Sequence, residues 1–369
     1  MAEHPSRRIA IIGCGFIGRI HSTVLLGLRR AGYTDGAVVA CCDSEVERAK
    51  KFAVFHGASV TTSDPAEAMG AADAAWICTP TSTHLRLVNL ACSLRLPVYC
   101  EKPLAPTLSE AEELGAAAAA AGIGVQVGLV LRSSPVLLAA RDHVVSAELG
   151  RLMAITFRDD QYFPIQGQYR SSWRADVSTA GGGTLIEHSI HDLDVLQWIA
   201  GPVRSVTAGT ANFAGHEGIE DVAAVSLVHE SGAISTLTSV WHSILSRPST
   251  RRIEMFCERG LLWTEDESAG PLHLQTDDGV SEVPLGHGSE ETGSSPEAGV
   301  IAALGLPATL KAPLSLYIRS DLAFLESLAT EKIPSPGLQQ ALDAHRLADL
   351  AYRSAAVAVT AATLVRPPI

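Results

Sequence analysis

The chain has 369 residues, of which 47% are hydrophobic and 18% are charged. This composition is typical of folded domains, because disordered chains are poor in apolar residues and rich in charge. The length exceeds what one hydrophobic core usually serves, so we expect two domains. The formal net charge of −12 disfavours nucleic acid or an anionic membrane as the main partner.

Cysteine usage and the start of the chain bear on the cellular compartment. The seven cysteines are odd in number and no two of them form a C-x-x-C pair. Free thiols in a reducing cytosol explain this better than a disulfide framework. The segment 1–8 lacks the layout of a secretory signal, and the Ala-rich stretch 116–121 is too short to cross a bilayer. We therefore interpret the protein as cytoplasmic, without a membrane partner.

Apolar runs of strand length alternate with helical patterns from residue 9 to about residue 128. Continuous apolar strands separated by helices are typical of a parallel sheet that helices cover on both faces. Thr107 and Glu110 have the spacing of a capping box, and Gly122 ends the helix that they begin. This layout predicts a Rossmann-type, doubly wound α/β domain. Its expected strands are 9–12, 38–42, 74–78, 98–100 and 125–127.

A glycine motif, Gly13-Cys-Gly15-Phe-Ile-Gly18, follows the first expected strand and opens a helix. Gly13 allows a tight turn, Gly15 lets the backbone approach a pyrophosphate, and Gly18 allows the helix to pack closely on the strand. The N–H groups at the start of this helix, around Phe16 and Ile17, favour an anion. A turn that serves packing alone is the alternative. The order of strand, glycines, helix and second strand favours a dinucleotide.

The second expected strand ends at Asp43, the position where an acidic residue takes the ribose hydroxyls of a dinucleotide. Its charge would repel the 2′-phosphate of NADP, so NAD is favoured. Two alternatives stay open. Asp43 could only cap the next helix, and Arg48, one turn along, could accept a phosphate. NADP therefore stays the second candidate cofactor.

Two further segments follow expected strands and carry a family signal. They are Thr79-Pro80-Thr-Ser-Thr-His84 and Glu101-Lys102-Pro103. Together with the glycine turn they resemble the Gfo/Idh/MocA family, which includes glucose–fructose oxidoreductase, inositol dehydrogenase and relatives. The resemblance implies that Lys102 reaches the substrate next to the nicotinamide. It also implies that the bond before Pro103 is often cis.

A second family signature lies in the C-terminal half of the chain. It runs Gly181-Gly-Gly-Thr-Leu-Ile-Glu187-His188-Ser-Ile-His191-Asp192-Leu-Asp194. Three glycines, an acidic residue, a histidine four later and an aspartate three later resemble the same family, so the resemblance covers essentially the whole chain. Glu187 stands where the family usually has Asp, and Ser189 where Gly is common. These departures would reshape the pocket, so the substrate of inositol or glucose enzymes does not carry over.

The expected catalytic residues are Lys102, His191 and Glu187. A helix advances about 100° per residue, so Glu187, His191 and Asp194 would share one sector of a single helix, which Trp198 continues. We expect His191 to be the general base, with Glu187 fixing its imidazole or a second substrate hydroxyl. Lys102 would give the reacting oxygen a hydrogen bond and positive charge.

Further residues complete the expected site. His188-x-x-His191 beside carboxylates could suggest a metal, but no third ligand set with metal spacing occurs in the sequence, so no metal is expected. Trp173 and Arg174 could contact substrate hydroxyls or only anchor a loop. The expected cofactor-binding residues are Gly13, Gly15, Phe16, Ile17, Gly18, Asp43, Thr79, Pro80, His84 and Glu101. The expected substrate-binding residues are Lys102, Arg132, Trp173, Arg174, Glu187, His188 and His191.

The sequence pattern changes at about residue 125. We expect a dinucleotide-binding Rossmann domain over 1–124 and a substrate-binding and oligomerisation α+β domain over 125–369. Short turns join strands that often alternate apolar and polar residues, which predicts an open, mostly antiparallel sheet. The acidic, Gly- and Ser-rich stretch 265–300 predicts loops around a short strand or two, and a helix is expected from about 338 to 362. The expected strands are 151–163, 203–213, 221–229, 233–240 and 251–257.

In the resembled family the open face of this sheet often forms dimer or tetramer contacts, so a homodimer or homotetramer is expected. The whole pattern predicts an NAD(P)-dependent oxidoreductase that moves a hydride between nicotinamide and a hydroxyl or carbonyl of a sugar, cyclitol or related polyol. Two alternatives keep the cofactor, namely a non-enzymatic NAD(P)-binding sensor and a glycosidase that uses transient oxidation. The presence of both Lys102 and His191 argues against the sensor, which has no need of both.

Overall fold

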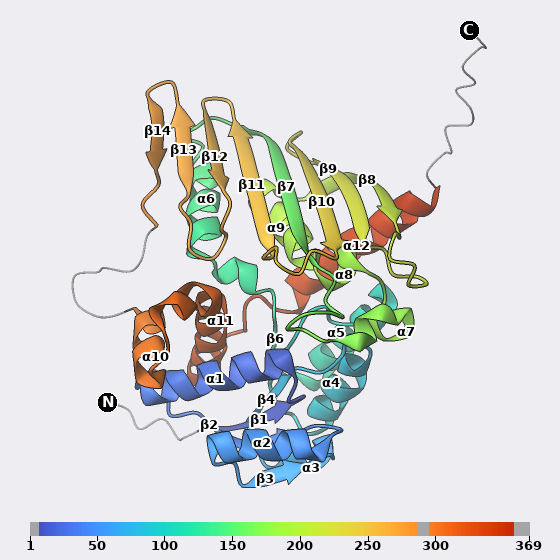
Figure 1. Ribbon diagram of the computed structural model, residues 1–369, viewed down its shortest axis with the longest axis vertical. Coiled ribbons are helices and arrows are strands. Elements are labelled where there is room, and N and C mark those ends of the chain that lie inside the picture. Colours follow the sequence, from blue (N-terminus) through green and yellow to red (C-terminus); the bar gives the residue numbers. More distant parts are fainter. Residues whose placement is uncertain (1–6, 286–294, 358–369) are drawn as a thin grey trace.

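The computed structural model describes residues 7–285 and 295–357, which form two domains, one above the other in Figure 1. The lower domain holds a six-stranded parallel sheet in the order β3-β2-β1-β4-β5-β6, which confirms the Rossmann fold class. Its strands and helices, in chain order, are β1 (Arg8–Ile12), α1 (Phe16–Arg30), β2 (Ala37–Cys42), α2 (Val46–His56), β3 (Val60–Thr62), α3 (Pro65–Gly70), β4 (Ala74–Ile77), α4 (His84–Ser93), β5 (Val98–Cys100), α5 (Leu108–Ala121) and β6 (Val125–Val127). The edge strand β3 was not expected, because its three residues are too few to form a recognisable pattern.

Both faces of the first sheet are buried, as its continuous apolar strands predict. Along β1, Ile9 and Ile11 pack into one core with α1 and two later helices, whereas Ala10 and Ile12 pack into a second core with α4 and α5. Helix α5 begins and ends as expected. The Thr107 hydroxyl accepts a hydrogen bond from the Glu110 N–H at 3.2 Å.

The upper domain holds an eight-stranded sheet in the order β14-β13-β12-β11-β7-β10-β9-β8. All its neighbouring strands pair antiparallel except β10 and β7, which are parallel. The prediction of a mostly antiparallel sheet is therefore confirmed. The one parallel pair was not predicted, because the short turns that we expected join only antiparallel strands. The long connection after β7, which contains helices, lets the chain return in the same direction. The strands are β7 (Leu152–Tyr162), β8 (Val203–Ala211), β9 (Val222–His229), β10 (Ile234–His242), β11 (Thr250–Cys257), β12 (Gly260–Thr264), β13 (His273–Thr276) and β14 (Gly279–Glu282).

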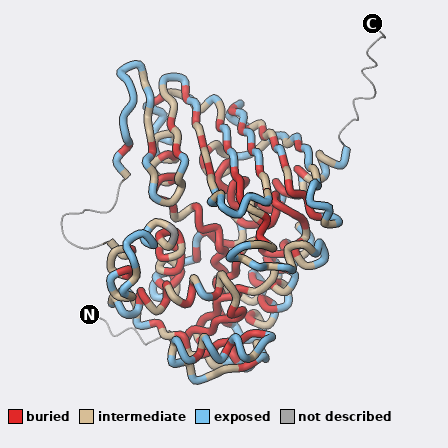
Figure 2. The backbone as a smooth tube through the Cα atoms, in the orientation of Figure 1, coloured by how far each residue is buried: buried red, intermediate tan, exposed pale blue. Residues whose placement is uncertain are grey.

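One face of the second sheet is covered and the other is open, as Figure 2 shows by the alternation of buried and exposed residues along the strands. On β7, Ile155 and Phe157 are buried under helices α9 and α12, whereas Thr156 and Arg158 are exposed. Helices of this half are α6 (Pro135–Ser146), α7 (Val177–Ala180), α8 (Thr184–Glu187), α9 (Ile190–Ala200) and α12 (Leu338–Val357).

The chain returns to the first domain near its end. Helices α10 (Pro296–Leu304) and α11 (Lys311–Thr330) pack against α1, and α12 runs from β8 of the second sheet to α5 of the first (Figure 1). The prediction of loops up to residue 300 is wrong for α10, since an Ala- and Gly-rich segment gave no clear helical period. Strand β6, which the expected boundary at 124/125 assigns to the second domain, pairs with β5 in the first sheet. The expected end of the last helix, at 362, lies outside the described residues.

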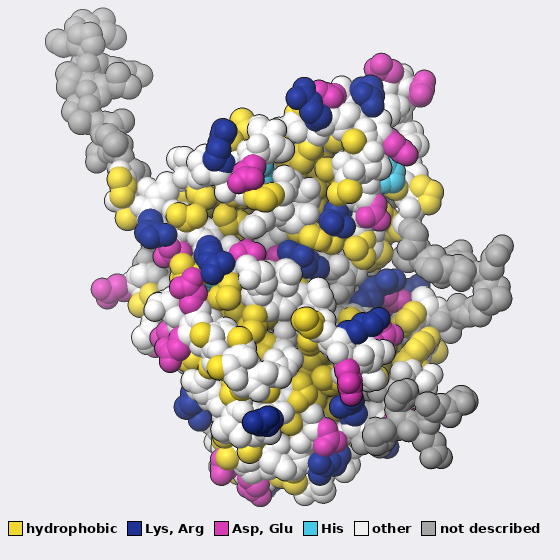
Figure 3. Space-filling view, turned by 180° about the vertical axis from the view of Figure 1, so that it is seen from behind, with side chains coloured by type: hydrophobic (Ala, Val, Ile, Leu, Met, Phe, Trp, Pro, Cys, Tyr) yellow, Lys and Arg dark blue, Asp and Glu magenta, His cyan; other side chains and the backbone are white. Residues whose placement is uncertain are grey.

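All seven cysteines are free thiols, as predicted. On the face shown in Figure 3, Lys and Arg side chains are interspersed with Asp and Glu, a pattern that differs from the basic stripe of nucleic-acid-binding domains. Over 7–285 and 295–357, no helix is both long and apolar enough to span a membrane.

Candidate active site

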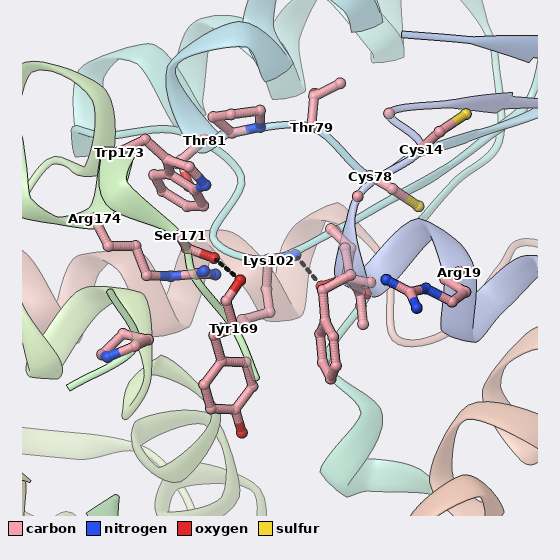
Figure 4. A pocket seen from close by; sticks show the side chains of 18 of the residues that line it. Cys14, Arg19, Cys78, Thr79, Thr81, Lys102, Tyr169, Ser171, Trp173 and Arg174 are labelled. Atoms are coloured by element: carbon pink, nitrogen blue, oxygen red, sulfur yellow. Dashed lines mark hydrogen bonds between the residues drawn. The ribbon is translucent and has the colours of Figure 1, made fainter. Parts of the chain in front are cut away.

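A cavity of about 1310 Å³ lies between the two domains. Its wall is formed by the glycine turn, the loops after β4 and β5, the segment that follows β7, and helices α8 and α9. In Figure 4 the side chain of Lys102 lies between Trp173, Arg174 and Tyr169 on one side and Cys14, Cys78 and Arg19 on the other. The cavity therefore brings together residues from both expected halves of the site.

The glycine turn has the close contacts and the opening that a dinucleotide needs. A Cβ atom on Gly13 would lie 2.6 Å from the Cys78 carbonyl oxygen, and one on Gly18 would lie 2.1 Å from the Gly13 carbonyl oxygen. A Cβ on Gly15 would meet nothing within 4 Å, and Gly15 lines the cavity. The backbone at Gly15 and the first N–H groups of α1 can thus approach a pyrophosphate, so these residues fit the cofactor.

Asp43 lies at the end of β2 and lines the cavity. Its carboxylate accepts hydrogen bonds from the Cys14 N–H at 2.8 Å and the Glu45 N–H at 2.9 Å. It therefore fixes the glycine turn and the approach to α2 together. Arg48 Nη1 lies 3.5 Å from Asp43, and Arg48 Nη2 donates to Glu45 at 2.7 Å. This arginine is paired with carboxylates.

Two loops near the expected nicotinamide position are tied together by His84. Its Nδ1 lies 2.9 Å from the Pro103 carbonyl oxygen and its Nε2 lies 3.0 Å from the Thr79 carbonyl oxygen. His84 is buried and does not line the cavity, whereas Thr79 and Pro80 do. His345 accepts a hydrogen bond from the Leu104 N–H at 3.0 Å. The loop that carries Lys102 is thus held from two helices, and its Lys102–Pro103 peptide is cis.

A third buried histidine holds Glu101. His21 of α1 lies 2.9 Å from Glu101 through Nε2 and 2.7 Å from Asp321 of α11 through Nδ1. Burial disfavours the charged imidazole, but Asp321 and Glu101 outweigh this and raise the pKa of His21 to about 10. The other Glu101 oxygen accepts from the Lys102 N–H at 3.1 Å. Sequence reasoning missed this network because Asp321 lies 300 residues away from His21.

Lys102 is half-buried in the wall of the cavity. Its Nζ donates a hydrogen bond to the backbone carbonyl of Glu187, so the first domain contacts the second at this point. Burial lowers the pKa of Lys102, while Glu187 acts in the opposite sense and Arg174 adds to the lowering. A buried ammonium with a lowered pKa is suited to proton exchange with a substrate oxygen.

Comparison with known proteins now identifies the family. A family model described as the oxidoreductase family, NAD-binding Rossmann fold, matches residues 7–129, and one for the GFO/IDH/MocA C-terminal domain matches residues 137–263. Together they cover more than half of the chain. The chain belongs to the Gfo/Idh/MocA oxidoreductase family. Its first domain is therefore an NAD-binding Rossmann domain.

Curated Gfo/Idh/MocA relatives include enzymes of sugar and cyclitol chemistry. The chain is 27% identical to 1,5-anhydro-D-fructose reductase of Ensifer adhaerens over 286 residues, covering 75% of this chain and 83% of the relative. It is 28% identical to inositol 2-dehydrogenase of Rhizobium meliloti (strain 1021) over 290 residues, covering 75% and 81%. The fold is shared with a solved structure of levoglucosan dehydrogenase in complex with NADH and levoglucosan, at a TM-score of 0.83 and 20% identity, covering 95% of this chain and 98% of the other.

We expected one continuous helix after the triple glycine. The structure has two helices there instead. Helix α8 ends at Glu187 and α9 starts at Ile190. The Ser189 hydroxyl lies within hydrogen-bond distance of Asp159, at 3.2 Å, and of Ser239, at 2.6 Å. These contacts favour a break in the helix over a further helical turn.

The break separates residues that were expected to share one stripe. The Glu187 carboxylate accepts hydrogen bonds from Thr81 Oγ1 at 2.6 Å and Arg174 Nε at 3.1 Å, so it does not orient the His191 imidazole. Asp194 faces away from the cavity and binds Arg132 through two contacts of 2.8 and 2.7 Å. Arg132 does not line the cavity either.

Most of the expected site residues of this Gfo/Idh/MocA member do line the cavity. They are Gly13, Gly15, Phe16, Ile17, Asp43, Thr79, Pro80, Glu101, Lys102, Trp173, Arg174, Glu187, His188 and His191. Gly18, His84 and Arg132 do not. Gly18 packs closely against Gly13, as expected. His84 is bonded to the Pro103 carbonyl and Arg132 to Asp194, so these two side chains hold neighbouring segments together.

Sequence reasoning missed a charged cluster where the second sheet meets the cavity, which Arg251 lines. Arg251 of β11 and Asp159 of β7 both point toward the covered face of the second sheet, where apolar residues are expected. A charged residue on the buried side of an alternating strand was the available signal, since such charges need buried partners. Among the described residues, no group of His, Cys, Asp and Glu is arranged to hold a metal ion.

Proposed function

We propose that this chain is an NAD(P)-dependent dehydrogenase or reductase that acts on a CH–OH group of a sugar, cyclitol or related polyol. The observation that carries the proposal is the meeting of Lys102 from the first domain and His191 from the second in the wall of one cavity. The glycine turn and Asp43 line the same cavity. The bound nicotinamide would supply hydride transfer, and the protein residues would manage the substrate proton.

In this proposal His191 takes the proton of the substrate hydroxyl during oxidation. Burial lowers the pKa of His191 well below its usual value, and the nearby charge of Lys102 lowers it further. The imidazole is therefore neutral at neutral pH and has a lone pair for the proton. Its Nδ1 is buried with no hydrogen-bond partner among the described residues, which leaves Nε2 for this role.

Lys102 stabilises negative charge on the reacting oxygen. Its ammonium is held by the Glu187 carbonyl, and Glu187 is in turn held by Thr81 and Arg174. Glu187 therefore acts in this proposal through the position of Lys102, and not by orienting His191. A preformed donor in a buried site stabilises developing charge without reorganisation at the moment of reaction.

NAD is the proposed cofactor, with NADP as the weaker candidate. The Asp43 carboxylate lies at the end of β2 with its oxygens held by two backbone N–H groups, so it cannot turn away from a ribose easily. A fixed carboxylate at this position favours ribose hydroxyls over a 2′-phosphate.

We also propose that the chain self-associates through the open face of the second sheet. Five apolar side chains form one cross-strand row there, from β9 through β10, β7 and β11 to β12. They are Val228, Ile234, Ala154, Phe256 and Leu261. Ile234 and Phe256 are exposed and the other three are half-buried, and apolar side chains that gather on a surface in this way mark contact surfaces.

A substrate scan tests the proposed reaction. Purified protein would be mixed with polyols, inositols, aldoses and keto-sugars in the presence of NAD⁺, NADP⁺, NADH or NADPH, and nicotinamide absorbance followed. Net formation or loss of NADH with at least one substrate is expected. Release of a leaving group without net NADH would indicate the glycosidase instead. Ligand-dependent thermal shifts with no reaction would indicate the sensor.

A further inference from the structure

His188 stands in the cavity wall with one ring nitrogen held by a carboxylate. Its Nε2 lies 2.9 Å from Asp159 Oδ2 and 3.1 Å from Asp159 Oδ1. Asp159 is fully buried, so the pair is a histidine–aspartate dyad set behind the cavity surface. The carboxylate partner of one ring nitrogen decides which tautomer an imidazole adopts.

Charged and polar side chains surround Asp159. Arg251 Nη2 lies 3.4 Å from Asp159, while Arg251 Nε donates to Asp192 at 2.9 Å. Burial and the neighbouring Asp159 raise the pKa of Asp192 to about 7, and Arg251 opposes this. Burial also raises the pKa of Asp159, but Arg251 and the hydrogen bond that the Ser189 hydroxyl donates to its carboxylate oppose this, and both neighbours favour Asp159 as an acceptor.

Because Asp159 is an acceptor, His188 Nε2 must carry the hydrogen and Nδ1 must carry a lone pair. Arg251 Nη2 also lies near Nε2, at 3.2 Å, but the carboxylate is closer. Nδ1 has no hydrogen-bond partner among the described residues, and the His188 side chain is 14% exposed where it lines the cavity. The lone pair is thus available to a molecule in the cavity.

We infer that His188 Nδ1 is a fixed hydrogen-bond acceptor for a second hydroxyl of the substrate, and that Asp159 is the positioning residue that sets its tautomer. We place this second hydroxyl beside the one that reacts at Lys102 and His191, because His188 and His191 are three residues apart in the chain and all three side chains line one cavity. The substrate class is therefore a vicinal diol. This ligand assignment rests on the proposed oxidoreductase function.

The dyad differs from His191 in a way that separates their roles. Asp159 holds the His188 Nε2 atom at 2.9 Å, so this ring is fixed in the cavity wall, and burial lowers its pKa well below the usual value as it does for His191. In the part of the chain that the structure describes, the His191 Nδ1 atom has no hydrogen-bond partner. A rigid acceptor suits recognition, whereas an unfixed imidazole can move with its proton.

The tautomer can be read directly, without any substrate. In protein labelled with ¹⁵N-histidine, His188 is expected to show a protonated Nε2 and an unprotonated Nδ1 from pH 6 to pH 8. Asp159→Asn presents an amide that can donate to Nε2, so His188 should switch to the Nδ1–H form. The His191 signals serve as the internal control and should keep their tautomer. A His188 that is already Nδ1–H or doubly protonated in the unmodified protein would overturn the inference.

Kinetics then tests the ligand. Myo-inositol, D-glucose and their monodeoxy derivatives would be compared by kcat/KM in the unmodified protein and in His188→Phe. A deoxy derivative that lacks the neighbouring hydroxyl should lose about 10- to 100-fold in the unmodified protein, because an acceptor is left unpaired. His188→Phe should erase that difference. If His188→Phe lowers kcat/KM by the same factor for the parent sugar and for every deoxy derivative, the hydroxyl contact is refuted. Absence of turnover with all polyols would contradict the proposed function, and the tautomer measurement would still decide the role of Asp159.

Discussion

The ammonium of Lys102 is buried between the loop after β5 and the Glu187 carbonyl, and burial lowers its pKa. Lys102→Ala should lower kcat by about 10²–10⁴-fold, because the variant loses the charge that stabilises the reacting oxygen. Cofactor affinity, measured by fluorescence titration with NADH, should stay near normal, since the glycine turn is unchanged. Lys50→Ala on the exposed surface of α2 is the matched control. Normal turnover in Lys102→Ala would remove Lys102 from the mechanism.

Asp43 has both carboxylate oxygens bonded to backbone N–H groups, which fixes its position in the cavity wall. Asp43→Ala should lower the ratio of kcat/KM for NAD⁺ over NADP⁺ by about tenfold or more, because the repulsion of a 2′-phosphate is lost. The exposed Asp142→Ala should leave the ratio unchanged. A ratio that stays the same in Asp43→Ala would count against the ribose contact.

At the scale of elements, the strand–turn–helix unit of β1 and α1 contains two glycines, one in a tight packing contact and one beside the open cavity. A Cβ on Gly18 would overlap the Gly13 carbonyl oxygen, whereas one on Gly15 would enter open cavity. Gly18→Ala should therefore destabilise the fold by about 1–3 kcal/mol or more, because the core cannot accept the added methyl.

Gly15→Ala should keep the unmodified thermal midpoint but weaken NADH binding by about tenfold or more, since its methyl occupies the place of the pyrophosphate. Differential scanning fluorimetry and NADH titration on the same preparations separate the two effects. A Gly15→Ala protein with normal NADH affinity would contradict the assignment of this turn to the cofactor.

At the scale of the whole molecule, His21 connects α1, the loop after β5 and α11 through two buried carboxylates. Its pKa is raised from 6.5 to about 10 in the folded state. A group with a raised folded pKa contributes stability that is fully present below the unfolded pKa of 6.5 and is lost as pH rises toward about 10.

The free energy of unfolding, measured in urea at pH 6, 8 and 10, should therefore differ between the unmodified protein and His21→Gln most at pH 6 and least at pH 10. His216→Gln, outside this network, should show a constant difference. If His21→Gln does not fold, Asp321→Asn gives the same comparison. A difference that grows with pH would contradict the charged state of His21.

The open face of the second sheet carries an apolar row in which Ile234 is 47% and Phe256 is 38% exposed. The double variant Ile234→Lys, Phe256→Lys should lower the molar mass measured by light scattering after size exclusion, because charges cannot be buried at an interface unpaired. Val54→Lys on α2, where Val54 is 86% exposed, should not. An unmodified protein that is monomeric at micromolar concentration would refute self-association.

Local patterns in the sequence determined the first domain, the glycine turn and the helix cap at Thr107, because each depends on neighbours within a few residues. The same holds for the strands of the second sheet except β12 (Gly260–Thr264), which was not predicted. The parallel pairing of β7 with β10 depends on a long connection, so no local pattern could predict it.

The sequence placed Lys102 and His191 in one site through family motifs, yet it gave the wrong partners for Glu187 and Asp194. Those partners, Thr81 and Arg132, come from elements far away in the chain. The histidines that hold the Lys102 loop and the Asp159–His188 dyad likewise join segments that only folding brings together. Motifs formed by neighbouring residues can be predicted from their spacing in the sequence. The partner of a buried charge depends on the tertiary structure, because a charge that is buried without a partner costs too much free energy.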